Sequence, residues 1–233
     1  MPKHMSGCLI CGRPLVYFED AQELPCAFCG KTFSANASCE DGHYICDACH
    51  MEKALDVITQ ACLETQSADP IAISRKIMRD PFVHMHGPEH HYLVPAVLLA
   101  AYKNAGGSID LEKCLRTARE RTQDIPGGIC GFLGCCGAGV GAGVFASIVS
   151  GATPLSGAEW GIANLATSRA LEAIAENGGP RCCKRDVFLS LSCMAPFSKK
   201  YFGVELSMPE KLKCSFFGSN PDCSKENCLY YPL

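Results

Sequence analysis

The sequence predicts a mostly α-helical protein that begins with a small cysteine-rich module. Aromatic residues make up only 8% of the chain while Gly is frequent, which favours close helix packing over a β-sandwich. Residues 51–195 contain a succession of segments with helical periodicity. Residues 1–50 show no such period and are rich in Cys and Gly. We therefore expect two domains, a module over residues 1–50 and an all-α domain over residues 51–233 with an irregular cysteine-rich tail.

Composition narrows the class of protein. The chain has 233 residues, 18 of them Cys, and a net charge of −3. This charge disfavours nucleic-acid binding, and in the module only Lys3, Arg13 and Lys31 are basic. No apolar run follows Met1, so we expect no signal peptide and a cytoplasmic location. Paired thiols stay available to metals in a reducing cytosol, and so many of them suggest an anaerobic organism.

One uncharged segment, residues 129–158, is long enough to cross a bilayer and contains small residues at four-residue spacing. Gly127-Gly128 and Pro154 interrupt it, and its Gly and Cys content dilutes its hydrophobicity. A buried glycine-rich helix is therefore favoured over a membrane span.

Helical periodicity and punctuation divide the second domain. The expected helices cover residues 51–66, 71–78, 92–104, 111–123, 134–150, 157–177 and 184–195. Asp110 is a suitable N-cap, and Ser156 with Glu159 has the spacing of a capping box. Residues 82–91 read FVHMHGPEHH and predict a polar loop before a helix. From Met208 the chain contains three prolines, so an irregular tail is expected.

The N-terminal module contains metal-ligand pairs. They are Cys8 and Cys11, Cys26 and Cys29, Cys39 and His43, and Cys46 and Cys49. Two thiols separated by two residues and followed by Gly form a zinc knuckle, and eight donors satisfy two tetrahedral zinc ions. Four protein ligands leave no coordination position for water, so the zinc would be structural. It would stabilise the fold of a segment that has few core residues. Such a module is a scaffold or contacts a protein partner; free buried thiols are the simpler alternative.

Spacing favours a crossed pairing of these donors. Cys46 and Cys49 stand at the start of a helix expected from about residue 47, and a knuckle combined with such a pair is the treble-clef arrangement. This combines Cys26 and Cys29 with Cys46 and Cys49, and Cys8 and Cys11 with Cys39 and His43. Sequential pairing remains open, and His50 could replace His43.

The cysteines of the second domain are of two kinds. Cys62, Cys114 and Cys193 lie singly on expected helices, where inert packing is the simpler interpretation. The others cluster: Cys130, Cys135, Cys136, Cys182, Cys183, Cys214, Cys223 and Cys228. No run has four thiols at ferredoxin spacing, so the ligands of an iron–sulfur cluster would come from separate segments. A third zinc site and redox disulfides are the alternatives, and we expect one member of each adjacent pair to bind.

Three segments are similar to the cysteine-rich region of the iron–sulfur L-serine dehydratases and L-cysteine desulfidases: HGPEHHYLVPAVLLAAY, GFLGCCGAGVGAGVFASIVSGATPLSGAEWGIAN and GGPRCCKRD, within residues 84–193. The resemblance implies a [4Fe–4S] cluster with one open iron, for which Cys135 or Cys136 and Cys182 match two ligands. The family's intermediate cysteine is absent, so Cys214, Cys223 or Cys228 would supply a third. The whole chain also resembles an uncharacterised family of cysteine-rich archaeal and bacterial proteins, which implies no mechanism.

These features lead to three hypotheses. The resemblance implies a lyase or desulfidase acting on a small thiol or hydroxy amino acid, with iron as Lewis acid. Its candidate bases are His84, His86, His90 and His91, with Glu89 and Lys184 as secondary candidates. For each His alone, a surface or capping role is the simpler alternative. The second hypothesis is a non-catalytic sulfur or electron carrier with a fully thiolate-bound cluster and a partner-docking zinc module, and the third is a zinc-dependent interaction protein without iron.

Overall fold

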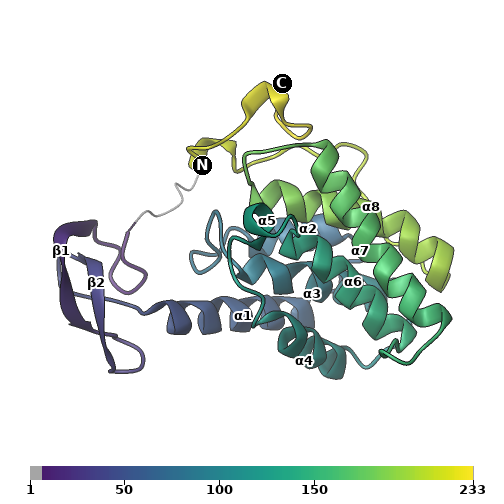
Figure 1. The fold of residues 1–233 in the computed structure, drawn as a ribbon, viewed down its shortest axis with the longest axis horizontal. Helices are drawn as coiled ribbons and strands as arrows, with labels where there is room; N and C mark the ends of the chain where they lie inside the picture. Colours follow the sequence, from purple (N-terminus) through teal and green to yellow (C-terminus); the bar gives the residue numbers. More distant parts are fainter. Residues whose placement is uncertain (1–6, 233) are drawn as a thin grey trace.

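The computed structural model describes residues 7–232 and confirms the predicted fold class (Figure 1). A two-stranded antiparallel sheet, β1 (Leu15–Pro25) and β2 (Thr32–Cys39), stands apart from the helices. Leu15 pairs with Cys39 and Pro25 with Thr32, with an irregularity between Tyr17 and Gln22. Most residues of β1 are exposed, whereas β2 buries Ala35, Ser38 and Cys39. A lone hairpin is at best marginally stable in water. The hairpin therefore needs support from outside its own apolar contacts.

Helices make up the rest of the regular structure between residues 40 and 232, apart from isolated bridges. They are α1 (Asp47–Glu64), α2 (Pro70–Ile77), α3 (Glu89–Asn104), α4 (Leu111–Thr122), α5 (Ile129–Phe132), α6 (Gly137–Ser150), α7 (Ala158–Glu176) and α8 (Cys183–Phe202). Two short 3-10 turns, η1 (Phe217–Ser219) and η2 (Lys225–Asn227), lie in the tail. Helix α1 leads from the hairpin into the helical part (Figure 1).

Helix α3 is the centre of the helical domain. Nearly all of its residues are buried, and it packs against α1, α2, α4, α6 and α8. An apolar sequence from Leu93 to Ala101 leaves no polar face, which is typical of a central helix. Pro95 lies inside this helix and has no N–H to offer the carbonyl of His91.

The glycines of α6 let two neighbouring helices approach closely. A Cβ atom on Gly137 or Gly141 would meet His91 of α3, at 2.1 Å from the ring and 2.7 Å from the carbonyl oxygen respectively. On the other side, a Cβ on Gly139 would stand 2.6 Å from Leu171 of α7. The glycine-rich segment is thus a buried packing helix, as predicted. Among the described residues, none of the helices combines the length and the apolar character that a bilayer crossing requires.

Several local predictions need correction. Ser156 and Glu159 form no capping box, because the Ser156 hydroxyl bonds Thr153 instead and the N-cap of α7 is Gly157. The polar loop ends earlier than expected, so that His90 lies in the first turn of α3. The N-cap role of Asp110 is confirmed, since its carboxylate accepts from the Lys113 N–H at 3.1 Å.

The tail folds back over the start of α8. The Cys214 N–H donates to the Tyr230 carbonyl at 2.7 Å, which closes the tail into a loop. The ring of Tyr230 meets Phe188 of α8 edge-on at 5.8 Å, and Arg75 of α2 donates to the Lys213 carbonyl. These contacts place the three tail cysteines beside Cys182.

Candidate metal centres and the neighbouring cavity

The structure gathers the eight donors of the N-terminal module into two groups of four. One contains Cys8, Cys11, Cys39 and His43, and the other contains Cys26, Cys29, Cys46 and Cys49. Within each group all ligand atoms lie within 4.8 Å of one another. This is the crossed arrangement favoured by spacing, and sequential pairing does not fit it.

The distances between sulfur atoms suit one tetrahedral ion in each group. The Cys11 and Cys39 sulfurs are 3.7 Å apart, and the Cys29 and Cys46 sulfurs are 3.9 Å apart. Sulfurs around a tetrahedral zinc stand about 3.8 Å apart, given Zn–S bonds of about 2.3 Å. Both groups therefore suit zinc or a metal of similar geometry.

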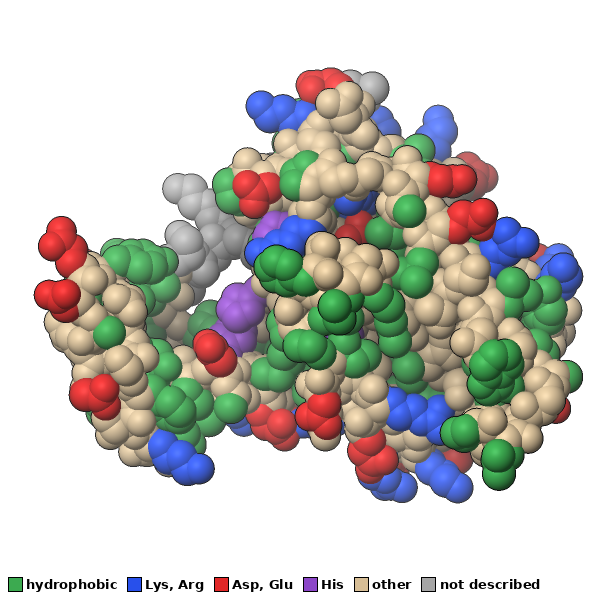
Figure 2. Space-filling model, in the orientation of Figure 1, with side chains coloured by type: hydrophobic (Ala, Val, Ile, Leu, Met, Phe, Trp, Pro, Cys, Tyr) green, Lys and Arg blue, Asp and Glu red, His purple; other side chains and the backbone are tan. Residues whose placement is uncertain are grey.

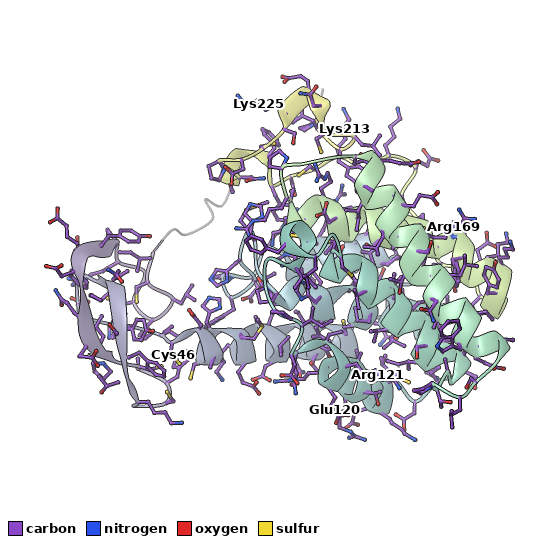
Figure 3. All side chains as sticks on the ribbon, viewed as in Figure 1. Cys46, Glu120, Arg121, Arg169, Lys213 and Lys225 are labelled. Carbon is purple, nitrogen blue, oxygen red and sulfur yellow. The ribbon has the colours of Figure 1, made fainter. Side chains whose placement is uncertain are left out.

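Backbone amides support the sulfurs. The N–H groups of Ile10 and His43 donate to Cys8 and Cys39 at 3.4 and 3.3 Å, as expected where a chain wraps around a thiolate. Gly12, which follows the first knuckle, has φ 76°, a left-handed conformation that a residue with a Cβ rarely adopts. Cys46 is the N-cap of α1, so the second group links the hairpin to the helical domain (Figure 3).

The group that contains Cys26 and Cys49 cannot ionise fully without a cation. Burial opposes ionisation of Cys26, but the N–H groups of Cys46, Cys29 and Phe28 lower its pKa to about 6. In the same group, hydrogen bonding to Cys46, reinforced by burial, raises the pKa of Cys49 to about 12. One thiolate thus forms readily while its neighbour is held protonated, and a bound divalent cation would remove this conflict.

His50 is not part of either group, so its proposed exchange with His43 is wrong. Its ring stacks on His84 with centroids 3.7 Å apart, and the ring of Phe82 lies 5.6 Å away. Phe28 of the module lies 6.4 Å from Phe82. These rings form the contact between the module and the helical domain, and histidine side chains are visible in the recess between the two parts (Figure 2).

A second set of cysteines meets in the helical domain, far from the module. Cys182, Cys214, Cys223 and Cys228 line one small cavity of about 20 Å³. They come from the N-cap of α8 and from the tail, which carries Lys213 and Lys225 beside them (Figure 3). Between residues 7 and 232 their sulfurs do not form a group within 4.8 Å, in contrast to the module. The four thiols therefore converge but stand farther apart than around one zinc ion.

The surroundings of this small cavity are mostly apolar. Its wall contains Met85, Phe188, Phe216, Phe217, Tyr230 and Tyr231. The Phe216 N–H donates to Cys214 at 3.3 Å, and the Lys225 N–H donates to Cys223 at 3.4 Å. Lys225 has φ 48°, an unusual conformation for a non-glycine residue. An apolar shell with amides directed at sulfur is the environment that tunes iron–sulfur clusters.

Three of the other predicted cysteines, Cys130, Cys136 and Cys183, line a different, larger cavity. Its volume is about 320 Å³, and its wall is formed by His86, Gly87, Pro88, His90, His91, Gly127, Gly128, Cys130, Cys136, Gly137, Ala138, Arg181, Cys183 and Asp186. The adjacent residues Cys182 and Cys183 thus face different cavities. Cys136 lines the larger cavity and Cys135 lines neither of the two. The expectation that one member of each adjacent pair binds a metal stays a prediction.

Three of the four predicted histidines reach the larger cavity. His84 does not line it, since it stacks on His50 at the module contact. The Nδ1 atoms of His90 and His91 lie 3.0 and 3.3 Å from the carbonyl oxygens of Gly87 and Ile125. A carbonyl can only accept, so Nδ1 carries the proton in both rings and Nε2 presents a lone pair. Burial lowers the pKa of both histidines, which keeps them neutral.

Buried charges surround the start of α8. Burial lowers the pKa of Lys184 to about 8, and its ammonium bonds the Val83 carbonyl at 3.3 Å and lies over the Phe216 ring. Arg185 pairs with Asp186 at 3.1 Å. The thiol of Cys136 donates to Asp186 at 3.7 Å, and burial, reinforced by this carboxylate, raises the pKa of Cys136 to about 12. Cys136 is therefore a neutral thiol in this structure.

Sequence reasoning missed the residues that connect the two cavities. The amide of Asn220 accepts from His86 Nε2 at 3.2 Å and donates to Cys182 at 3.7 Å. It is 6% exposed, although it lies in an irregular tail. Arg181 and Asp186 line the larger cavity and were not predicted. In the sequence, the one indication of a role for Arg181 and Asp186 was that they lie close to the Cys182-Cys183 pair.

Fold and site together define a helical protein with two donor groups suited to metal binding and a third convergence of cysteines. Residues 58–231 match the family model described as "Family of unknown function (DUF5714)", and because this is most of the chain, the protein belongs to that family. Neither curated proteins nor solved structures gave a match. Family membership implies no activity, so the resemblance to iron–sulfur dehydratases stays a prediction.

Proposed function

We propose that this protein is a zinc and iron–sulfur metalloprotein in which Cys182, Cys214, Cys223 and Cys228 hold a [4Fe–4S] cluster. The observation that carries the proposal is the meeting of these four thiols, from the start of α8 and the tail, around one apolar cavity. Soft thiolate ligands select zinc, copper(I) and iron–sulfur clusters among biological metals.

The spacing of the thiols favours a cluster over a single ion. In the N-terminal module the same chain brings donors for one ion within 4.8 Å of one another, whereas the four tail-side thiols are not grouped so closely. A cluster stands between its ligands and separates them more than one zinc does. The free space of about 20 Å³ requires the tail to move outward when a cluster binds. A tail without strands or long helices permits this movement.

Electron transfer is the role that this ligand set supports best. Four thiolates would occupy all four irons, which leaves no vacant position for a substrate. All four cysteines are half-buried, so the cluster would lie near the surface of the helical domain, within reach of a redox partner. The zinc module is attached through α1, and its strand β1, which is mostly exposed, would contribute a docking surface.

The larger cavity favours a second candidate, a lyase or desulfidase. Three thiols line it, from Cys130, Cys136 and Cys183, together with three histidines. A cluster held by three cysteines would keep one open iron, which supplies Lewis-acid chemistry. His90 and His91 present unprotonated Nε2 atoms and could accept a proton from a substrate.

Metal analysis of anaerobically purified protein tests the proposal. We expect about two zinc ions and about four irons with acid-labile sulfide per chain. Exchange of Cys214 and Cys228 for Ser should remove the iron and leave the zinc. Exchange of Cys114 and Cys193 for Ser, two cysteines outside both cavities, is the matched control and should change neither metal. A third zinc in place of iron would contradict the proposal.

A second double substitution distinguishes the two candidate functions. Exchange of Cys136 and Cys183 for Ser should leave the iron content unchanged if the tail-side site holds the cluster. If this exchange removes the iron instead, and the wild-type protein releases sulfide or ammonia from cysteine or serine, the lyase is the correct function.

A further inference from the structure

We propose that the larger cavity binds a small organic acid that also carries a hydrogen-bond donor, with the acid group at a meeting point of helix N-termini and the donor on His90. This ligand class goes beyond the electron-transfer function proposed above and does not depend on whether the tail holds a cluster.

Three long helices begin at this cavity. The residues that line it include Pro88, the N-cap of α3, Cys136, the N-cap of α6, and Cys183, the first residue of α8. These helices have 16, 14 and 20 residues, and no side-chain hydrogen bond caps any of their N-termini. Each N-terminus carries roughly half a positive charge together with free N–H groups, a combination that attracts anions. Convergence of three makes the cavity favourable for a carboxylate.

An unpartnered ring nitrogen supplies an independent indication of a ligand. His90 is 1% exposed, and its Nε2 atom has no hydrogen-bond partner among the described residues. Because Nδ1 donates to the Gly87 carbonyl, Nε2 must be an acceptor. A buried acceptor without a partner costs free energy unless a ligand or water supplies a donor. His86 repeats the pattern: its Nε2 donates to Asn220, and its buried Nδ1 has no partner within residues 7–232.

The charged side chains around the cavity add to the positive charge of the helix N-termini. Arg181 is exposed and lines the cavity wall. Asp186 lies in the wall but is paired with Arg185, and Glu89 beside His90 has Lys184 in its electrostatic environment. The three cations and two carboxylates leave an excess of one positive charge. Together with the partial positive charges of the three helix N-termini, this excess makes the cavity favourable for an anion.

The size of the cavity and its two kinds of polar group define the ligand class. A volume of about 320 Å³ admits a compound of metabolite size. Helix N–H groups and Arg181 provide donors for an oxyanion, while His90 and His86 provide acceptors for a hydroxyl, thiol or amine. A hydroxy acid therefore fits better than a plain carboxylic acid of the same length.

Ligand-observed NMR titration of the full-length protein as purified, with matched probes, tests this inference. Lactate and propionate have the same carbon skeleton and charge and differ in one hydroxyl group. We expect lactate to bind about threefold to tenfold more tightly, the contribution of one hydrogen bond. Inorganic phosphate is the competing inorganic anion and should bind more weakly than lactate if the cavity is built for an organic acid.

Two variants, with a control and a substitute, assign the contacts. Arg181→Gln should weaken both acids by a similar factor, while Arg169→Gln, which removes an exposed charge from α7, should leave both unchanged. His90→Phe should abolish the preference for lactate and retain propionate binding. His90 is buried, so its replacement by Phe risks unfolding the protein. If His90→Phe unfolds, His86→Ala is measured in its place and should reduce the preference for lactate over propionate.

Three results would overturn the inference: equal affinity for lactate and propionate in the wild-type protein, no binding of any of the three probes, or tightest binding of phosphate. Iron and zinc contents of the same samples keep this test separate from the function proposed above. A sample without iron that still prefers lactate would contradict the cluster and support the acid-binding cavity.

Discussion

Substitution of Ala for two glycines is expected to change stability in opposite directions. A Cβ on Gly141 would stand 2.7 Å from the backbone oxygen of His91 and 2.8 Å from Cδ of Pro95. These backbone and ring atoms cannot turn aside, so α3 and α6 must separate. A Cβ on Gly161, the fourth residue of α7, would meet nothing within 4 Å. The same chemical change is therefore made once in a tight helix contact and once in open space.

The magnitudes follow from packing and helix propensity. Overpacking a close-packed contact costs about 1–3 kcal/mol, and Ala in place of a helical Gly returns about 1 kcal/mol. For Gly141→Ala we expect a net loss of about 1–2 kcal/mol because the clashing atoms are rigid. Gly161→Ala should gain about 0.5–1 kcal/mol. At about 2–4 °C per kcal/mol in a chain of this size, the melting temperatures should move in opposite directions by a few degrees.

Thermal melts followed by circular dichroism at 222 nm measure both variants against the wild-type protein, with metal contents checked in each sample. If Gly141→Ala is as stable as the wild-type protein, or gains stability as Gly161→Ala does, then α3 and α6 do not approach as closely as described. The account of the glycine-rich segment as a packing helix would then be wrong.

Three further predictions concern the metal groups, Lys184 and the module contact. Cys8 and Cys39 belong to the same donor group, so replacing both by Ser should remove one zinc. Cys8 and Cys26 belong to different groups, so replacing both by Ser should remove two. Loss of two zinc ions in the first variant and one in the second would establish sequential pairing. Lys184→Met should be more stable than the wild-type protein at pH 7 by up to about 3 kcal/mol in urea unfolding, since the Lys184 pKa falls from 10.5 to about 8 on folding. This gap should narrow as the pH rises from 8 towards 10.5, because the unfolded chain then holds the proton that the folded chain has lost; a gap independent of pH would contradict it. Phe82→Ala removes the ring between Phe28 and His50 and should make the hairpin more susceptible to limited proteolysis without loss of zinc; unchanged proteolysis would show that this contact does not hold the module.

The N-terminal metal groups were predictable because their information is local. Cys-x2-Cys pairs followed by Gly specify a knuckle whatever surrounds them, and the helix start at Cys46 favoured crossed pairing. Sequential pairing stayed open until the structure grouped the donors. The central helix and Asp110 were predictable for a similar reason, since apolar sequence and an N-cap act over a few residues.

The division of the remaining cysteines was not predictable because it depends on tertiary packing. Cys182 and Cys183 direct their thiols to different cavities as the chain enters α8, and no spacing rule indicates which residue faces which cavity. His84 shares a short segment with His86, yet packing against His50 removes it from the cavity. The capping box failed because Thr153 competes for the Ser156 hydroxyl within the same turn.

Anomalous diffraction from crystals grown without oxygen, recorded at the iron and zinc absorption edges, tests the central proposal most directly. We predict zinc peaks within the two donor groups of the N-terminal module and an iron peak between Cys182 and the tail cysteines. An iron peak between Cys136 and Cys183, or a zinc peak in place of iron beside Cys182, would contradict this assignment.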